Sequence, residues 1–318
     1  MKQCNRSDDG CVSWHCSTRV LPVTSPGSAA GEMFAAQPRA LIVTVYGLYA
    51  RDSGGWFGIA ALIRLMAELG IEGPAVRSAM SRLKSRGLVE SRRDGGAVGY
   101  GVTSRGAKFL AEGDRRIFDR PRVVVPDGWL LVVFSVPEQE RSRRHALRSR
   151  LTWLGFGTVS AGAWIAPAHL AAETRDVLAA DGMAGYVSLF TADYLAFGDL
   201  REKVGQWWDL GRLERLYQAF IDSASPILAR WQAAGPRAVA APTAAGPDPA
   251  DRSGRAFADY VRVLTVWRRL PFLDPGLPAE LMPESWAGAR AGRLFGELRG
   301  LLAGPAAEHV RAIRQAVG

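Results

Sequence analysis

Cysteine is nearly absent from this 318-residue chain: Cys4, Cys11 and Cys16 all lie within the first sixteen residues, and no other follows. The rest of the chain therefore has no disulfide, and packing must stabilise it, as is usual in the reducing cytoplasm. Cys11 and Cys16 lie close to His15, but their spacing matches no familiar zinc pattern. We expect neither a metal nor a cofactor.

Long apolar runs are missing as well. The longest, residues 40–50, is well short of the roughly 20 residues that a membrane-spanning helix needs. The first residues include Asp8 and Asp9 and lack a continuous apolar core, which argues against a secretory signal. These absences predict a cytoplasmic protein without a membrane segment.

The sequence also has no obvious catalytic set. The four histidines are scattered, without evident orienting partners: His15, His145, His169 and His309. Nucleophilic catalysis requires a nucleophile, a base and a group that orients the base. We therefore expect no catalytic residues, and a chain that is not an enzyme.

Positive charge, in contrast, is plentiful. The chain has 40 Lys+Arg against 31 Asp+Glu, a formal charge of +9, which favours a polyanionic partner. Its 48% hydrophobic and 22% charged residues are ordinary globular values, and its length suggests two or three domains. Residues 1–36, rich in Ser, Gly and Ala, are predicted to be a disordered tail.

Residues 37–117 combine helical patterns with a short hairpin. The dense apolar run at 40–49 fits a buried helix or a strand, and its context favours a helix. The predicted elements are helices at 40–49, 59–69 and 75–86, strands at 88–91 and 98–102 around a basic turn at 92–96, and a helix from residue 103. This order predicts a winged helix-turn-helix domain, whose second paired helix enters the major groove.

The helix at 75–86 has two chemically different faces. At 100° per residue, the apolar side chains of Val76, Ala79, Met80 and Leu83 point inward. The outward face carries small hydroxyls between long cations, which suits a helix lying deep in a groove of double-stranded DNA. The predicted DNA-binding residues on this helix and the following turn are Arg77, Ser78, Ser81, Arg82, Lys84, Arg92 and Arg93.

The concentration of charge supports this interpretation. Residues 73–93 hold six basic residues and one acid, Glu90, so over half of the surplus charge lies in this short segment. A solvated basic surface remains the simpler alternative, and a protein that packages DNA without sequence preference is another.

Residues 122–195 show the pattern strand, helix, strand, strand, helix, strand, which predicts a ferredoxin-like domain. Its first helix, residues 138–154, places leucines inward and arginines outward: Arg141, Arg143, Arg144, Arg148 and Arg150. That arginine face is either solvated or a second surface that contacts phosphates.

Residues 196–318 are predicted to be a helical domain. An Ala/Pro/Gly-rich stretch at 232–254 has no apolar stripe and is predicted to be a flexible insertion. A final helix is expected from residue 289 to about residue 303. The whole chain is thus expected to be an α+β protein of three domains.

Several segments together resemble the PaaX family, bacterial repressors of phenylacetic acid catabolism and related regulators. The resemblance covers residues 38–303 and rests on residues 41–47, 76–83, 88–90, 103–106 and 273–283, with Trp286. It implies the same three domains, the central one similar to CRISPR-associated RNases, and the last serving effector binding and dimerisation. It further implies a homodimer on palindromic operators, released by aryl-CoA thioesters such as phenylacetyl-CoA.

An acyl-CoA effector needs cations for its phosphates and an apolar pocket. Arg268, Arg269 and Asp274, beside Phe272 and in the turn at 274–276, are the predicted effector-binding residues. In the alternative interpretation, Arg269 pairs with Asp274 and the neighbouring aromatic side chains belong to the core.

A metal-dependent RNase is the alternative function, given the central domain. Such an enzyme needs a carboxylate at the end of the first strand of that domain to hold a divalent cation. This chain has residues 135–137 there without an acid, and Asp127 lies at the opposite end of the strand.

Overall fold

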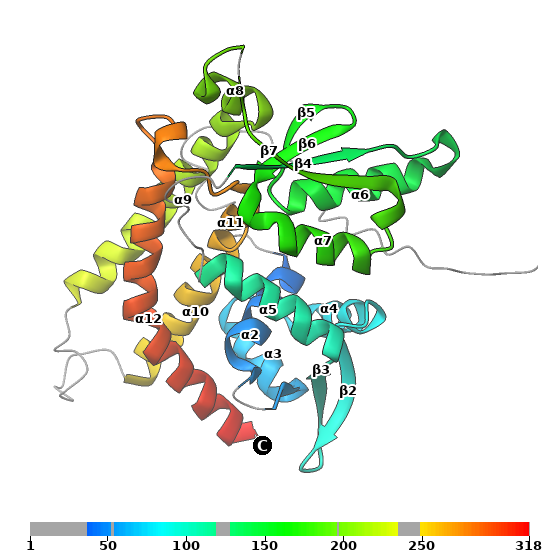
Figure 1. Ribbon diagram of the computed structural model, residues 1–318. Coiled ribbons are helices and arrows are strands. Elements are labelled where there is room, and N and C mark those ends of the chain that lie inside the picture. Colours follow the sequence, from blue (N-terminus) through cyan, green and yellow to red (C-terminus); the bar gives the residue numbers. More distant parts are fainter. Residues whose placement is uncertain (1–36, 52–53, 119–127, 196, 235–248, 318) are drawn as a thin grey trace, which may run out of the picture.

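Figure 1 shows a computed structural model of the chain, which describes residues 37–51, 54–118, 128–195, 197–234 and 249–317. The predicted tail, with Cys11, His15 and Cys16, lies outside the described residues, as does most of the predicted insertion. Helices predominate, and the described strands form two antiparallel sheets, so the chain has the expected α+β composition.

The first unit contains four helices and a small sheet. Its elements are α2 (Pro38–Tyr49), β1 (Trp56–Gly58), α3 (Ile59–Glu68), α4 (Gly73–Ser85), β2 (Val89–Asp94), β3 (Ala97–Val102) and α5 (Ser104–Phe118). The ambiguous apolar run is a helix, α2, which begins at Pro38 and buries Leu41, Ile42 and Val45. Pro38 suits a helix start because its missing N–H has no partner there anyway.

The hairpin differs from the expected one. We predicted a turn at 92–96, but β2 continues to Asp94 and pairs there with Ala97. Only Gly95 and Gly96 form the turn, with φ of 55° and 87°. Positive φ at both central residues is typical of the type I′ turn, whose twist matches that of the two strands. The strand β1, which we did not predict, completes a sheet of order β1-β3-β2.

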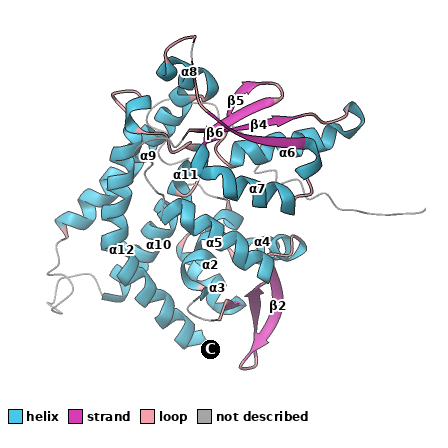
Figure 2. Cartoon of the chain, viewed as in Figure 1, coloured by secondary structure: helices cyan, strands magenta, loops and turns pink. Residues whose placement is uncertain are grey.

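The central unit has one sheet with helices on one face. Its elements are β4 (Trp129–Phe134), η2 (Glu138–Glu140), α6 (Arg141–Trp153), β5 (Gly157–Ser160), β6 (Ala163–Pro167), η3 (Ala168–Leu170), α7 (Ala171–Ala180), η4 (Ala184–Tyr186) and β7 (Val187–Ala192). The antiparallel strand order is β5-β6-β4-β7. Leu147, Leu151 and Leu154 are buried as expected, in one hydrophobic cluster with residues of this sheet. Figure 2 shows α6 and α7 along one face of the sheet.

The rest of the chain is helical. Its elements are α8 (Leu200–Trp207), α9 (Leu210–Ala233), α10 (Pro249–Trp267), α11 (Leu270–Leu273), η6 (Ala279–Leu281) and α12 (Ala287–Val317). The predicted insertion at 232–254 is wrong at both ends, because α9 continues to Ala233 and α10 begins at Pro249. The last helix is also longer than expected: it passes through Pro305 and ends at Val317 rather than near residue 303.

The first unit and the C-terminal helices share one hydrophobic core. One cluster of buried side chains contains residues of α2, α3 and α4 together with residues of α9, α10 and α12, from Leu41 to Ile313. Inside it, the hydroxyl groups of Thr44 on α2 and Thr265 on α10 lie 2.7 Å apart and satisfy one another. Each hydroxyl also lies within hydrogen-bond distance of a carbonyl one turn earlier on its own helix, Ala40 at 3.1 Å and Val261 at 2.6 Å, so the buried pair is fully satisfied where the two helices meet. The first unit is therefore not separately packed.

Arg116 on α5 joins the first unit to the central one. Its side chain, 12% exposed, contacts the Glu173 carboxylate of α7 at 3.1 Å and donates to the Trp153 carbonyl at 3.0 Å. The guanidinium also lies 5.0 Å from the ring centroid of Trp153 and 5.3 Å from that of Phe272 on α11. One cation thus contacts elements from all three parts of the chain.

The length and hydropathy of a helix decide whether it can cross a membrane. Among the described residues, none of the helices combines the length and the apolar character that crossing a bilayer would require.

Candidate nucleic-acid interface

The helix α4 presents the predicted basic face to solvent. Val76, Ala79, Met80 and Leu83 are buried, which confirms the inward face derived from the helical period. The outward side chains of α4, which we call the basic face, are all exposed: Arg77, Ser78, Ser81, Arg82 and Lys84. No part of the neighbouring units covers these five side chains in the described structure.

A hydrogen bond connects the basic face to the hairpin. The Lys84 ammonium donates to the Ser91 hydroxyl of β2 at 3.0 Å. Alternate residues of a strand point to the same face of its sheet, so Arg93 lies on the same side as Ser91 and Val89. Arg93 is exposed and therefore extends the basic face along the hairpin.

Arg92 points to the other side of the sheet. Its guanidinium donates to the Gly54 carbonyl at 3.4 Å, and its own carbonyl accepts from the Trp56 indole at 3.2 Å. The strand β3 lies between β1 and β2, and it has glycines where the side chains of Trp56 and Arg92 cross it. A Cβ on Gly99 would lie 2.7 Å from the Trp56 ring, and one on Gly101 would lie 3.5 Å from the Arg92 guanidinium. We predicted Arg92 and Arg93 together in one turn, but both lie in β2, where neighbouring side chains point to opposite faces of the sheet.

Substitution of Gly99 tests that crossing. In Gly99→Ala, the new methyl would lie 2.2 Å from the Phe57 carbonyl oxygen, so β1 must move away from β3. We expect a loss of about 1–3 kcal/mol in the free energy of unfolding, as for other overpacked sites. Urea unfolding measures it. Gly205→Ala is the control, because its added Cβ meets nothing within 4 Å; equal stability of the two variants would contradict the assignment.

A hydrogen bond connects the residue before α5 to the turn that follows α4. The Thr103 hydroxyl accepts from the Gly106 amide at 3.0 Å, as an N-cap, and donates to the Gly87 carbonyl at 2.6 Å. Gly106 is buried against Leu88. Arg105 and Lys108, in the same first turns of α5, are exposed cations that sequence analysis did not assign to the interface.

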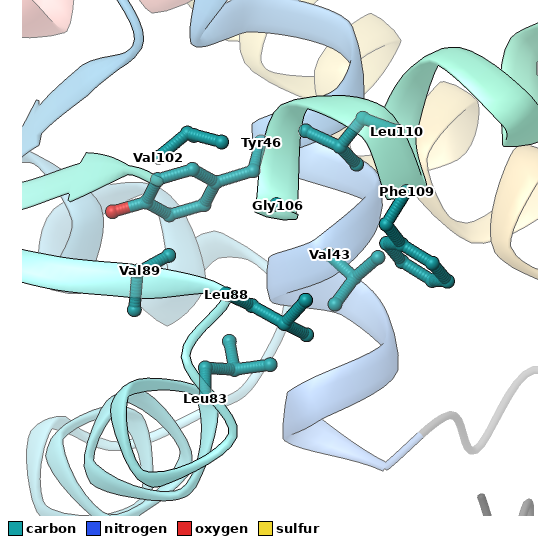
Figure 3. Close-up of a pocket in the computed structure, with 9 residues that line it drawn as sticks. All are labelled: Val43, Tyr46, Leu83, Leu88, Val89, Val102, Gly106, Phe109 and Leu110. Carbon is teal, nitrogen blue, oxygen red and sulfur yellow. The ribbon is translucent and has the colours of Figure 1, made fainter. Parts of the chain in front are cut away.

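Beneath the hairpin lies a small apolar gap of about 20 Å³ (Figure 3). Its walls come from α2, α4, the hairpin and α5: Val43, Tyr46, Leu83, Leu88, Val89, Val102, Gly106, Phe109 and Leu110. It is far smaller than the several hundred Å³ of a ligand pocket, so it is a packing gap. Burial raises the pKa of the Tyr46 phenol, which stays neutral and donates to the Tyr100 carbonyl at 3.2 Å.

The arginines of α6 mostly have protein partners. Arg144 contacts Glu138 at 2.8 Å, Arg143 contacts Glu140 at 2.8 Å, and Arg150 contacts Asp181 at 2.5 Å. Arg141 lies 3.6 Å from Glu138, and Arg148 donates to the Ala161 carbonyl. This pairing favours a solvated, internally neutralised surface over a second phosphate-binding surface.

The predicted effector residues lie at a junction between units. Arg268 donates to the Ala40 carbonyl of α2 at 3.2 Å, and Arg269 is exposed. Asp274 accepts from the Tyr217 hydroxyl at 2.6 Å and from the Gly276 amide at 2.8 Å. Trp267 is buried in the shared core, as the alternative interpretation expected for it.

The segment that follows Asp274 packs against the central sheet. Leu277, Leu281 and Met282 pack with Trp129 on the face of that sheet that α6 and α7 leave open. The segment therefore fastens the C-terminal helices to the central unit. Next to it lies an open hollow of about 390 Å³, within the size range of ligand sites. Its lining residues are Arg201, Gly205, Trp208, Asp209, Leu210, Gly211, Leu281 and Pro283.

The features of a metal-dependent RNase do not come together. Within the described ranges, no group of three or more His, Cys, Asp or Glu side chains is placed to hold a metal ion. Glu138, the acid nearest the end of β4, is paired with arginines of α6. The geometry does not favour the RNase alternative.

Comparison with known families matches successive parts of the chain. A family described as PaaX-like protein matches residues 37–106, the PaaX protein central Cas2-like domain matches residues 125–204, and the PaaX-like protein C-terminal domain matches residues 208–312. The order of these matches defines a three-part PaaX-like chain. The protein belongs to the PaaX family.

One curated relative and one solved structure are similar to the chain. Transcriptional repressor PaaX of Escherichia coli (strain K12) is 27% identical over 257 residues, covering 80% of this chain and 77% of the relative. A repressor is not an enzyme, in agreement with our expectation for this chain. The solved structure, uncharacterized protein Rv0674 from Mycobacterium tuberculosis, has a TM-score of 0.54 and 23% identity, and the match covers 87% of this chain and 97% of that one. This second likeness concerns the fold alone.

Proposed function

We propose that this protein is a sequence-specific DNA-binding transcriptional repressor that an aryl-CoA thioester, such as phenylacetyl-CoA, releases from its operator. Residues 37–117 act as a winged helix-turn-helix domain, residues 122–195 as a ferredoxin-like domain, and residues 196–318 as a helical domain for effector binding and dimerisation. The observation that carries the proposal is the solvent-exposed basic face of α4, joined to a basic hairpin through Lys84 and Ser91. Membership of the PaaX family and the repressor relative support it.

In the proposed complex, each half of a homodimer places α4 in the major groove of a double-stranded operator. Arg77, Ser78, Ser81 and Arg82 meet base edges or nearby phosphates, because small hydroxyls allow close approach and arginine matches guanine. The sugar-phosphate backbone is contacted by Lys84, Arg92 and Arg93, with Arg93 on the α4 side of the hairpin.

A mobility-shift titration tests this function. The full chain is titrated against the promoter region of its own gene and against random duplex of equal length, with and without phenylacetyl-CoA and other acyl-CoAs. We expect tighter binding to the promoter and release by an aryl-CoA. Equal affinity for both duplexes would point to a packaging protein. A shift unchanged across the acyl-CoA panel would refute the effector and leave the repressor in place.

Salt dependence gives an independent measure of the interface. Each phosphate neutralised by a cation adds about 0.9 to the slope of log affinity against log salt. Five cations per protomer, those of the basic face and the hairpin, therefore predict a slope of roughly −4.5 per protomer. Titrations over a range of potassium chloride concentrations measure it, and a slope near zero would contradict phosphate contact by these residues.

The proposed effector site couples to the first unit through Arg268. A CoA phosphate that attracted Arg268 would draw it from the Ala40 carbonyl at the start of α2. A ligand shifts an equilibrium only by its difference in affinity for the two states, and this exchange would supply such a difference. Arg269 and Asp274 complete the site, the former as an exposed cation and the latter by holding the turn.

Replacing Arg269 tests the location of this site. In Arg269→Ala, we expect unchanged operator affinity without ligand, because the side chain is exposed, and several-fold more acyl-CoA for release. Release is followed by the same mobility shift. A normal response would contradict the site and favour the hollow beside Leu281; Gly205→Trp, which projects a large side chain there, would then block the response.

A further inference from the structure

The end of α12 packs against the DNA-binding unit. Pro305 lies inside this helix, where it cannot donate a backbone hydrogen bond and its ring displaces the preceding turn, so the helix bends. Figure 1 shows that α12 changes direction and that its red end reaches the region of α2 and α3. Beyond the bend, Ala306, Val310 and Ile313 recur at helical spacing and are buried in the shared core.

His309 attaches this end of α12 to α3. Its Nε2 lies 2.8 Å from both carboxylate oxygens of Glu68, the last residue of α3, and its Nδ1 lies 3.2 Å from the Ser253 hydroxyl of α10. The His309 side chain is only 12% exposed. The last turns of α12 therefore contact α3 where it leads into α4.

Arg314, one turn and a half further along, attaches α12 to the small sheet. Its guanidinium donates to the Trp56 carbonyl at 3.1 Å and to the Tyr49 carbonyl at 3.5 Å. It also lies 4.6 Å from the ring centroid of Phe57, which is fully buried. One planar cation thus holds the end of α2 and the strand β1 together, which its several fixed N–H donors make possible.

The strand β1 in turn supports the hairpin. β1 pairs with β3 from Trp56 to Gly58. The Trp56 indole crosses β3 to donate to the Arg92 carbonyl of β2. Arg92 reaches back to the Gly54 carbonyl, just before β1. A continuous series of contacts therefore runs from Arg314 through Trp56 to Arg92, next to the proposed DNA contact Arg93.

We propose that the end of α12 is a brace that fixes the orientation of the β2–β3 hairpin relative to α4, with Arg314 as a positioning residue for DNA binding. Arg314 acts through Trp56 and Arg92 rather than by touching DNA. The inference rests on the proposed DNA-binding function. It assigns a role to a segment that begins where the sequence predicted that the helix would already have ended.

A double-mutant cycle on the full-length protein tests the brace. Arg314→Met keeps most of the side-chain length and removes the donors, and we expect operator affinity to fall about five-fold, because a hairpin that is free to reorient must be ordered again when DNA binds. In an Arg93→Ala background the same change should have a smaller effect, because one of the two proposed hairpin contacts that the brace positions, Arg92 and Arg93, is already gone. Arg311→Met, an exposed cation on the same helix, is the matched control and should leave affinity unchanged.

Equal effects of Arg314→Met with and without Arg93 would overturn the proposal, as would an equal loss in Arg311→Met. Hydrogen exchange provides a readout that needs no DNA. In Arg314→Met, or in Arg314→Lys where the first variant fails to fold, amides of residues 89–102 should exchange faster while those of α4 stay protected. Unchanged hairpin protection would refute the brace. Should the wild-type chain bind no duplex, exchange would still decide the brace while the proposed function alone failed.

Discussion

Replacement of both arginines of the basic face, Arg77→Ala with Arg82→Ala, is expected to weaken operator binding by roughly 2–6 kcal/mol, since each arginine that contacts a base contributes about 1–3 kcal/mol. Both side chains are exposed on α4 and are free of any structural demand from the core. Titration of a labelled operator duplex at fixed salt measures the loss, and circular dichroism checks that the variant is folded.

The matched control removes two arginines elsewhere. Arg212 and Arg215 are exposed at the start of α9, three residues apart on a helix that does not carry the basic face. Their double alanine variant loses the same charge and is expected to bind within about 0.5 kcal/mol of the wild type. Equal losses in both double variants would show that the basic face acts only through overall charge. A loss from Arg77 and Arg82 that is equal on operator and random duplex would identify phosphate contacts instead of base contacts.

Gly106→Ala is the second change with a large expected effect. A Cβ at this position would lie 2.1 Å from the Leu88 carbonyl oxygen and 2.9 Å from a methyl of Val102. The first neighbour is backbone that directly follows α4, so relief requires that α5 move away from the end of that helix. We expect the free energy of unfolding to fall by about 3 kcal/mol, the upper part of the range for overpacked cores. Urea unfolding followed by tryptophan fluorescence measures it.

A second glycine gives the opposite expectation. Gly300 lies exposed within α12, and a Cβ there meets nothing within 4 Å. Because alanine is the better helix former, Gly300→Ala should stabilise the chain by roughly 0.5–1 kcal/mol. If Gly106→Ala were as stable as Gly300→Ala, the close approach of α5 to Leu88 would not exist in solution.

The sequence was most informative where one face of a helix is buried. The inward positions of α4 and of α6 follow directly from the helical period, because these helices pack one apolar side against a core. The separate roles of Arg92 and Arg93 could not be derived in the same way. They depend on β2 extending to Asp94, which we had placed in the turn because of its polar residues.

Other differences come from contacts between residues far apart in the chain. β1 has only three residues, too few to show a period, and exists because β3 pairs with it. Gly304 and Pro305 are usual signs of a helix end, yet α12 continues because Ala306, Val310 and Ile313 still fit the shared core. The partners of Arg268 and Asp274, Ala40 and Tyr217, lie on α2 and α9, where sequence proximity gives no indication of them.

The shared core also has a consequence for synthesis of the protein in the cell. The first unit is made early, but its hydrophobic contacts with α10 and α12 form only after residues 249–317 have left the ribosome. Prematurely terminated products would expose the apolar side of α2 and α3 and become substrates for proteases. Nonsense mutations that remove α10 and α12 are therefore expected to behave as complete losses of the regulator, without an N-terminal fragment that occupies the operator.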